Sequence, residues 1–299
     1  MDRLSAMRVF VQVVDSGSFA GAAQALDLSN AVVTRQVAAL EAHLGARLLN
    51  RTTRRMSLTE AGDEFCVRAR SILEQFAEAE AVAGRGTSSP VGLLRLSAPL
   101  SYGISHLAPV LARFRRQHPQ LRLDVDLSDR VTDLADEGVD VALRIGSRLD
   151  PGIVARRIAS LDAVVCAAPS YLQRRGTPRE PAELAAHETL SFSYLWAGDE
   201  WPFTGPDGHR QHVRVRPSVH SSNGELLREL AVAGGGVILQ PRFIVEQALR
   251  AGTLVPVLED YRTLDLNLYA VYLSRSFLPS KVRVFIDFLV DALGTGERA

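Results

Sequence analysis

Cysteines, lysines and long apolar runs are scarce in this chain of 299 residues. Its two cysteines, Cys66 and Cys166, stand far apart, which excludes a disulfide framework and a four-cysteine zinc site. No apolar stretch approaches the roughly 20 residues that a membrane-spanning helix needs. The first residues lack the apolar core of a signal peptide. We therefore expect a reduced, cytoplasmic protein with no membrane partner.

The chain also lacks a net charge, because 34 Lys and Arg residues balance 34 Asp and Glu residues. This balance neither indicates nor excludes nucleic-acid binding, since the electrostatic footprint depends on local clustering. Lys281 is the only lysine, and the arginines that replace lysine elsewhere suit contacts with phosphate and guanine. With 46% hydrophobic residues, the chain has enough apolar side chains for two or three domain cores.

The first 45 residues have the apolar spacing of three short helices. Ser16-Gly17-Ser18 interrupts the first apolar stripe, and Ser18 is suited to cap the second helix. Asp27-Leu28-Ser29 predicts a tight turn before the third helix, and Gly45 is suited to end that helix. Two short helices joined by a tight turn are typical of a helix-turn-helix.

A basic hairpin and a long helix follow. The run Arg51-Thr52-Thr53-Arg54-Arg55 stands between apolar residues, which predicts a wing with a basic tip. Thr59 is suited to cap the long helix, and a single heptad seam on it indicates packing against a second copy of the chain. The segment 84–90 has the composition of a flexible linker. The seam consists of Phe65, Ala69, Ile72, Phe76, Ala79 and Ala83.

From residue 91 onward, predicted strands alternate with predicted helices. The alternation is typical of an α/β fold with mostly parallel sheets, and roughly 200 residues suffice for two subdomains. The whole chain is therefore predicted to be a multidomain α+β protein. The predicted strands are 93–97, 121–127, 139–145, 154–158, 163–167, 189–193, 213–216 and 237–239. The predicted helices are 101–117, 131–137, 223–233, 242–251 and 281–293.

Several motifs stand in a fixed order between residues 10 and 62. They include Phe10-Val-Gln-Val-Val-Asp-Ser-Gly-Ser-Phe-Ala-Gly-Ala-Ala-Gln-Ala-Leu26 and Leu28-Ser-Asn-Ala-Val-Val-Thr-Arg-Gln-Val-Ala-Ala-Leu-Glu41. Leu44-Gly-Ala-Arg-Leu-Leu-Asn-Arg-Thr-Thr-Arg-Arg55 and Leu58-Thr-Glu-Ala-Gly62 follow. Together these motifs resemble the opening of LysR-type transcriptional regulators. The resemblance is specific at the N-terminus and looser beyond it, where the order and lengths of the family's segments are kept.

The resemblance implies an N-terminal winged helix-turn-helix, a linker helix and a C-terminal effector-binding module similar to a type 2 periplasmic binding protein. It also implies homodimers through the linker helix, tetramers or larger assemblies on double-stranded operator DNA, and RNA polymerase as a further partner. No enzymatic activity and no cofactor are expected. The implied boundaries are 1–58 for the DNA-binding domain, 59–90 for the linker helix and hinge, and 91–299 for the effector domain, with subdomains 91–163 plus 264–292 and 164–263.

The third predicted helix offers side chains for reading DNA. A recognition helix directs its first polar turns into the major groove. Arg35 has the fork that binds guanine O6 and N7, while Thr34 and Ala31 suit a thymine methyl or a phosphate. Arginines of the wing suit phosphates or a narrow minor groove. The candidate DNA-binding residues are Ser29, Asn30, Ala31, Thr34, Arg35, Arg51, Thr53, Arg54 and Arg55.

Strand ends in the α/β region predict a ligand cleft. Ligands of open α/β sheets bind outside the carboxyl ends of strands, near helix N-termini. Donors from two helix starts, with Arg144 nearby, favour an anionic or polar organic effector. The alternative is a DNA-binding regulator without an effector, whose α/β module serves only oligomerisation. The candidate effector-binding residues are Ser101, Tyr102, Gly103, Asp129, Arg144, Gly146, Phe192, Ser193, Ser221 and Asn223.

Other features do not predict chemistry of their own. His209 and His212 stand in a loop without a third metal ligand, so we expect no metal site. The run 234–236 lacks the lysine of a phosphate-binding loop and is better suited to end a helix before a strand. Cys166 stands in an apolar strand, which predicts a structural thiol. Trp196 and Trp201 are expected to be packing residues.

Overall fold

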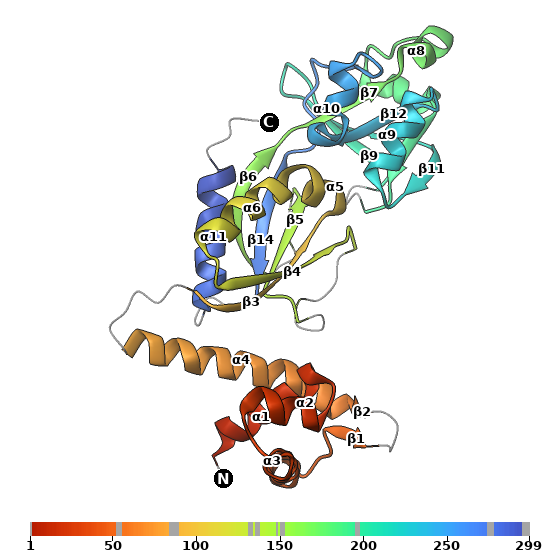
Figure 1. The fold of residues 1–299 in the computed structure, drawn as a ribbon. Helices are drawn as coiled ribbons and strands as arrows, with labels where there is room; N and C mark the ends of the chain where they lie inside the picture. The colour runs from red at the N-terminus through yellow and green to blue at the C-terminus, as the bar shows by residue number, and fades with distance from the viewer. Residues whose placement is uncertain are drawn as a thin grey trace. The chain divides into compact units, whose positions relative to one another are not determined.

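The computed structural model describes residues 2–51, 56–83, 90–130, 134, 138–147, 149, 153–194, 198–273 and 278–294. The chain divides into two units, Met1–Ser89 and Pro90–Ala299 (Figure 1). The predicted wing tip, most of the predicted linker and nearly all of the predicted helix 131–137 lie outside the described residues. Within the described part, no helix is both long enough and apolar enough to cross a membrane.

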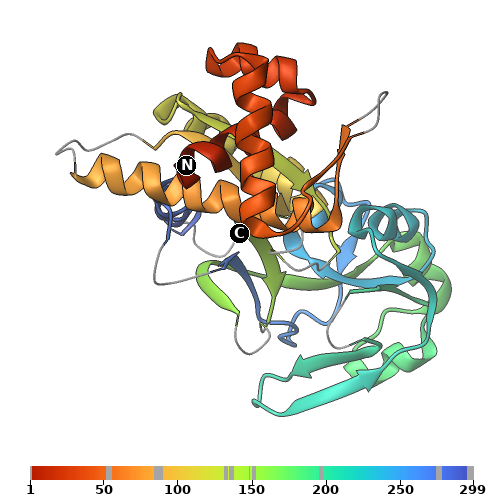
Figure 2. The same cartoon turned by 90° about the horizontal axis from the view of Figure 1, so that it is seen from below.

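The first unit is a helical bundle with a short hairpin, and the start of α4 lies against α1 (Figures 1 and 2). The predicted caps are confirmed: Ser18 Oγ accepts from Gly21 N at 3.0 Å, and Ser29 Oγ accepts from Val32 N at 3.3 Å. Gly45 follows α3 with a φ of 66°, the left-handed conformation that glycine adopts readily. The elements are α1 (Arg3–Ser16), α2 (Phe19–Leu26), α3 (Asn30–Leu44), β1 (Leu49–Arg51), β2 (Met56–Leu58) and α4 (Glu60–Ala83).

The apolar seam of α4 has two different environments. Ala69 is fully buried in the core of the first unit, and the Phe65 ring lies 5.7 Å from the Phe10 ring of α1. Further along, Ile72 and Phe76 remain 43% and 39% exposed. At its start the seam packs on another helix, as predicted, but that helix is α1 of the same chain and not a second copy.

The second unit contains two five-stranded sheets. The first, in the order β4-β3-β5-β14-β6, consists of β3 (Gly92–Ala98), β4 (Leu121–Leu127), β5 (Val141–Gly146), β6 (Val154–Leu161) and β14 (Leu266–Tyr272). The second, in the order β11-β8-β12-β7-β13, consists of β7 (Ala163–Ala167), β8 (Thr189–Phe192), β11 (Pro217–Ser221), β12 (Val237–Pro241) and β13 (Val255–Pro256). Between β8 and β11 the chain forms an antiparallel hairpin of β9 (Glu200–Thr204) and β10 (Arg210–Arg214).

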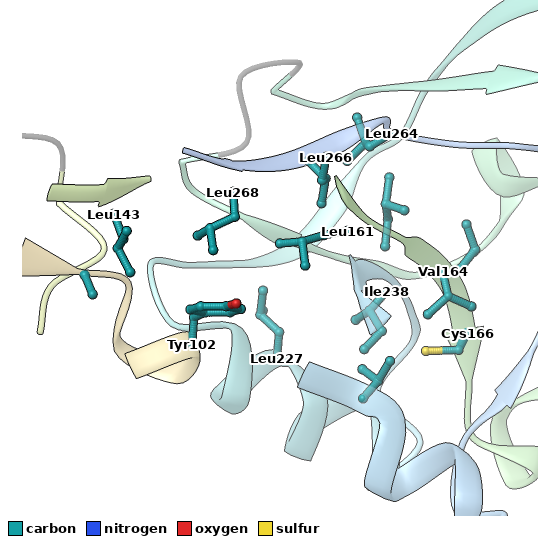
Figure 3. Close-up of a cluster of buried hydrophobic side chains, with 14 of the residues drawn as sticks. Tyr102, Leu143, Leu161, Val164, Cys166, Leu227, Ile238, Leu264, Leu266 and Leu268 are labelled. Atoms are coloured by element: carbon teal, nitrogen blue, oxygen red, sulfur yellow. The ribbon is translucent and has the colours of Figure 1, made fainter. Parts of the chain in front are cut away.

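Helices cover both sheets (Figure 1). Those following the first sheet's strands are α5 (Leu100–Tyr102), a π-helical turn η1 (Gly103–Leu107), α6 (Ala108–Gln117) and α11 (Ser280–Leu293). Those of the second sheet are α8 (Pro169–Arg175), the short helix η2 (Pro181–Ala186), α9 (Gly224–Val232) and α10 (Arg242–Arg250). One core of buried side chains extends through both sheets and includes Tyr102, Leu268, Val164 and Ile238 (Figure 3).

The sheets are mixed, so the prediction of mostly parallel sheets is wrong. β3 runs parallel to β4 and β5, and β8 runs parallel to β11 and β12. β14 runs antiparallel to β5 and β6, and β7 runs antiparallel to β12 and β13. The antiparallel strands are those that carry the chain between sheets: β6 passes into β7 through Asp162, and 257–265 returns from β13 to β14.

The only lysine of the sequence is buried. Lys281 on α11 is 4% exposed, and its Nζ donates to the Leu93 carbonyl at 2.7 Å. The same Nζ lies 3.0 Å from Asp140 Oδ2, which also accepts from Arg95 N at 2.8 Å. This ion pair therefore joins α11 to β3 and to the residue just before β5.

Candidate functional site

The third helix of the first unit has one buried and one exposed face, as predicted. Val33, Val37 and Leu40 are buried in the core. Arg35 is exposed, and so are the residues at the start of the helix, while Thr34 is half-buried. The exposed set comprises Ser29, Asn30, Ala31, Arg35 and also Ala38, which the sequence analysis did not single out although it follows Arg35 by one helical turn.

A carboxylate joins this helix to the hairpin. Glu41 Oε1 accepts from Leu48 N at 2.8 Å and from Leu49 N at 3.1 Å. Thr59 Oγ1 donates to the Arg47 carbonyl at 2.7 Å. Because Leu48 and Leu49 are also buried, the exposed face of α3 and the base of the hairpin are held in a fixed relation.

The predicted wing is present as a strand pair with Leu49 opposite Leu58 and Arg51 opposite Met56. Its tip residues Thr53, Arg54 and Arg55 lie outside the described residues, and only the backbone of Arg51 is described. Their contacts with DNA therefore stay predictions.

The second unit contains a cavity of about 150 Å³, partly open to solvent, that residues of both sheets line. Pro99 follows β3, Asp129 comes shortly after β4, and Gly146 ends β5. From the second sheet, Phe192 ends β8 and Pro241 ends β12. The cavity thus lies at the carboxyl ends of strands, the position where ligands of α/β sheets bind.

Six of the ten predicted pocket residues line this cavity, and four lie elsewhere. The six are Ser101, Tyr102, Asp129, Arg144, Gly146 and Phe192. The four are Gly103, Ser193, Ser221 and Asn223. A Cβ at Gly103 would lie under 3.0 Å from the Leu127 side chain, so this glycine serves close packing. Asn223 Oδ1 accepts from Leu226 N at 2.8 Å and so caps α9, while Ser221 Oγ accepts from the N–H of this cap residue at 3.0 Å.

The sequence analysis missed most of the residues that the second sheet and α10 contribute to the pocket wall. Gln240 on β12, only 2% exposed, lies there beside Leu239 and Phe243. Gln240 is the one polar side chain in the otherwise apolar run Val237–Pro241, which is the signal that could have found it. The further lining residues are Ser128, Ile145, Tyr194, Gly224, Ile244, Leu264 and Leu266.

Two opposite charges lie on the pocket wall. Arg144 Nη1 donates to Ser97 Oγ and to the Leu143 carbonyl, both at 3.3 Å. Asp129 Oδ1 accepts from Leu100 N at 3.2 Å. Burial raises the pKa of the Asp129 carboxyl, against the effect of the Leu100 N–H. Burial also raises the pKa of Tyr102 to about 12, so this phenol is neutral near pH 7.

Aromatic rings connect the two halves of the second unit beside the pocket. The Tyr102 ring stacks on His106 with centroids 5.1 Å apart, and Phe243 of α10 meets these rings edge-on at 5.3 and 5.4 Å. Burial lowers the pKa of His106, and the charge of Glu246 opposes this shift.

The described residues hold no group of three His, Cys, Asp or Glu side chains that could bind a metal ion. Cys166 is buried in β7, and burial raises its pKa to about 12, so its thiol stays protonated. Trp201 is buried on β9, in agreement with a packing role, while Trp196 lies outside the described residues.

Both units match known families. Residues 4–63 match the bacterial regulatory helix-turn-helix of the lysR family, and residues 87–294 match the LysR substrate binding domain. The transcriptional regulator CrgA of Neisseria meningitidis serogroup B is 38% identical over 291 residues, covering 96% of each chain.

Solved structures of transcriptional regulators are also similar to this chain. The structure of Neisseria meningitidis CrgA is similar with a TM-score of 0.60 at 37% identity, covering 97% of this chain and 99% of that one. The full-length Vibrio cholerae virulence activator AphB gives a TM-score of 0.60 at 29% identity, with the same coverage of 97% and 99%. These relatives are transcriptional regulators, not enzymes. The chain therefore belongs to the LysR-type family of transcriptional regulators.

Proposed function

We propose that this protein binds operator DNA sequence-specifically and that a small anionic or polar organic effector in the pocket of the second unit changes this binding. Residues 1–58 read DNA, 59–90 link and dimerise, and 91–299 bind the effector, with 91–163 plus 264–292 and 164–263 as its two lobes. The observation that carries the proposal is a pocket lined by both sheets in a chain that also has an exposed helix-turn-helix face.

The DNA contacts come from α3 and the wing. Arg35 reads a guanine, with Asn30, Ala31 and Thr34 beside it, and Arg51 with the wing tip holds phosphates. Ser29 fixes the start of α3 at the DNA backbone. The overall neutral charge makes these local contacts the source of DNA affinity.

The proposed assembly is a homodimer through α4 that forms tetramers or larger oligomers on the operator and contacts RNA polymerase. The exposed Ile72 and Phe76 of α4 support the dimer, because large apolar side chains in one helical stripe favour a helix partner.

The proposed switch is a change of angle between the two lobes. The chain passes between the sheets only at Asp162 and within 257–265, so each lobe is connected through two short segments suited to hinge motion. A ligand held by both walls favours one angle by its difference in affinity for the two states. Lobe movement then changes the assembly, and with it the bend of bound DNA.

Footprinting on the intergenic DNA beside the protein's own gene tests the reading of DNA. The wild type is expected to protect an interrupted palindrome. Arg35→Ala should lose this protection, since one bidentate guanine contact discriminates by about 1–3 kcal/mol. Arg116→Ala, which removes an exposed arginine of α6, serves as the matched control and should bind like the wild type. Equal binding of all three proteins to any DNA would contradict specific reading by α3.

Thermal melting with a library of small organic acids and alcohols tests the effector. Binding to the native pocket is expected to raise the melting temperature, and above the Kd the rise should increase with the logarithm of ligand concentration. A library in which no compound raises it would favour the alternative, in which the α/β module serves only oligomerisation.

A further inference from the structure

Polar side chains are distributed unequally over the pocket wall. The first sheet and its connections contribute Ser101, Ser128, Asp129 and Arg144. Among the described lining residues of the second sheet and its helices, Gln240 is the only buried polar side chain, since Tyr194 is 48% exposed. The second sheet therefore meets a ligand mainly with apolar groups and one amide.

The amide of Gln240 has an unsatisfied donor. The residue is 2% exposed, and its Nε2 has no hydrogen-bond partner among the described residues. At the other end of the amide, Oε1 faces Gly224, where an added Cβ would lie only 3.0 Å away. A buried donor left unpaired is unfavourable in a folded protein. At the wall of a cavity, a ligand acceptor removes this penalty.

The size and charge of the cavity restrict the ligand. The cavity is partly open, and its volume of about 150 Å³ matches one that holds benzene, so the part of the ligand inside it has the size of one ring or a short branched chain. Ile145, Leu239 and Phe243 suit an apolar body. Arg144 is the one cationic side chain among the described residues of the wall, and Asp129 disfavours further negative charge, so the wall accommodates one acid group better than two.

Resting on the effector role proposed above, we propose that Gln240 is the residue by which the second sheet recognises the effector, and that the effector is a small monocarboxylic acid. One acid group accepts hydrogen bonds from the Gln240 amide and from Arg144. These two donors belong to different sheets, so the acid ties the two lobes together. Asp129 accepts a hydrogen bond from a hydroxyl on the same ligand.

The near-isosteric variant Gln240→Met tests the unsatisfied amide without any ligand. Removing an unpaired buried donor should leave the melting temperature unchanged or raise it. Gln247→Met, at an exposed position of α10, is the matched control. A clear fall in melting temperature for Gln240→Met but not for the control would show that the amide has a structural role, and would overturn the proposal.

Calorimetric titration then tests the ligand class. The probes are monoacids (benzoate, 4-hydroxybenzoate, 3-methylbutanoate), the matched alcohols, and the diacids phthalate and succinate. We expect the wild type to prefer a monoacid. Gln240→Met should raise the Kd of the monoacid by about 10-fold or more. It should raise the Kd of the matched alcohol by less, because hydrogen bonds to charged groups are the stronger ones. Gln240→Glu should weaken binding of the monoacid further, because the two carboxylates repel each other.

The outcomes separate the two proposals. A wild type that binds alcohols or diacids but no monoacid, or a Gln240→Met variant that binds the monoacid as tightly as the wild type, would overturn this inference and leave the effector role standing. A wild type that binds no small molecule in the library would overturn both.

Discussion

At the scale of single residues, one backbone atom excludes any side chain at Gly62. A Cβ there would lie well under 3.0 Å from the Leu48 carbonyl oxygen, and this oxygen also accepts from Thr59 N at 3.0 Å. The start of α4 can therefore approach the hairpin only with glycine at this position. The sequence showed a Thr-Glu-Ala-Gly motif, but only the packing explains its last residue.

We predict that Gly62→Ala destabilises the first unit by about 2 kcal/mol or more, since the clash is with backbone that a rotamer change cannot relieve. Urea unfolding of the full chain should show an earlier transition for the first unit and an unchanged one for the second. Ala61→Ser, one residue away and exposed, should unfold like the wild type. Equal midpoints for both variants would refute the clash.

The buried Lys281 leads to a second prediction. Lys281→Met leaves Asp140 without its ion-pair partner, and breaking a buried pair typically costs about 3–5 kcal/mol. Asp140 is partly accessible, with 20% of its side chain exposed, so the lower end of that range is expected. Denaturant unfolding measures the loss, and Arg283→Met on the exposed side of α11 is the control. A loss below about 1 kcal/mol would mean that water replaces the ammonium group.

At the scale of elements, the helix starts were predictable because a cap is local. Ser18, Ser29 and Thr59 all accept from the backbone N–H three residues ahead, as their positions indicated. The direction of β14 was not predictable, because its partners β5 and β6 are far away in sequence. The strand itself was not among the predicted ones, although the alternation of Leu266, Leu268 and Ala270, all buried, is the signal that could have found it.

The pocket was predictable mainly on the side of the first sheet, with Phe192 as the one correct residue of the second. Ser101 and Arg144 were found because a general rule places ligands at the carboxyl ends of strands. Gln240 was missed because the predicted strand ended at residue 239, one residue before it, and Phe243 because its position depends on how α10 packs beside the first sheet. The rule locates one wall, whereas the opposite wall depends on the packing of the two lobes.

The aromatic contact between α10 and the helix after β3 predicts a pH effect. Because burial lowers the pKa of His106 below its ordinary 6.5, the neutral ring stabilises the fold above pH 6.5. This contribution is lost as the pH falls from 6.5 through the lowered pKa. His106→Phe keeps a stacking ring and cannot be protonated, so its melting temperature should fall less on acidification. His187, whose pKa burial also lowers, contributes equally in both proteins. Identical acid sensitivity of the two would contradict this assignment.

At the scale of the whole molecule, a neutral chain carries an exposed helix-turn-helix face and a pocket in separate units. A single protein with both features is suited to convert the concentration of a small molecule into a change on DNA. The conversion requires that the ligand prefers one lobe arrangement, since a ligand with equal affinity for both states shifts nothing.

The most direct test compares footprint length and DNA bend angle of the operator complex with and without the small acid that stabilises the protein most. The account predicts that saturating acid changes the bend angle or the length of the protected DNA. Gln240→Met should need a higher acid concentration for the same change. An unchanged footprint and bend at saturating, demonstrably bound ligand would contradict effector control of DNA binding.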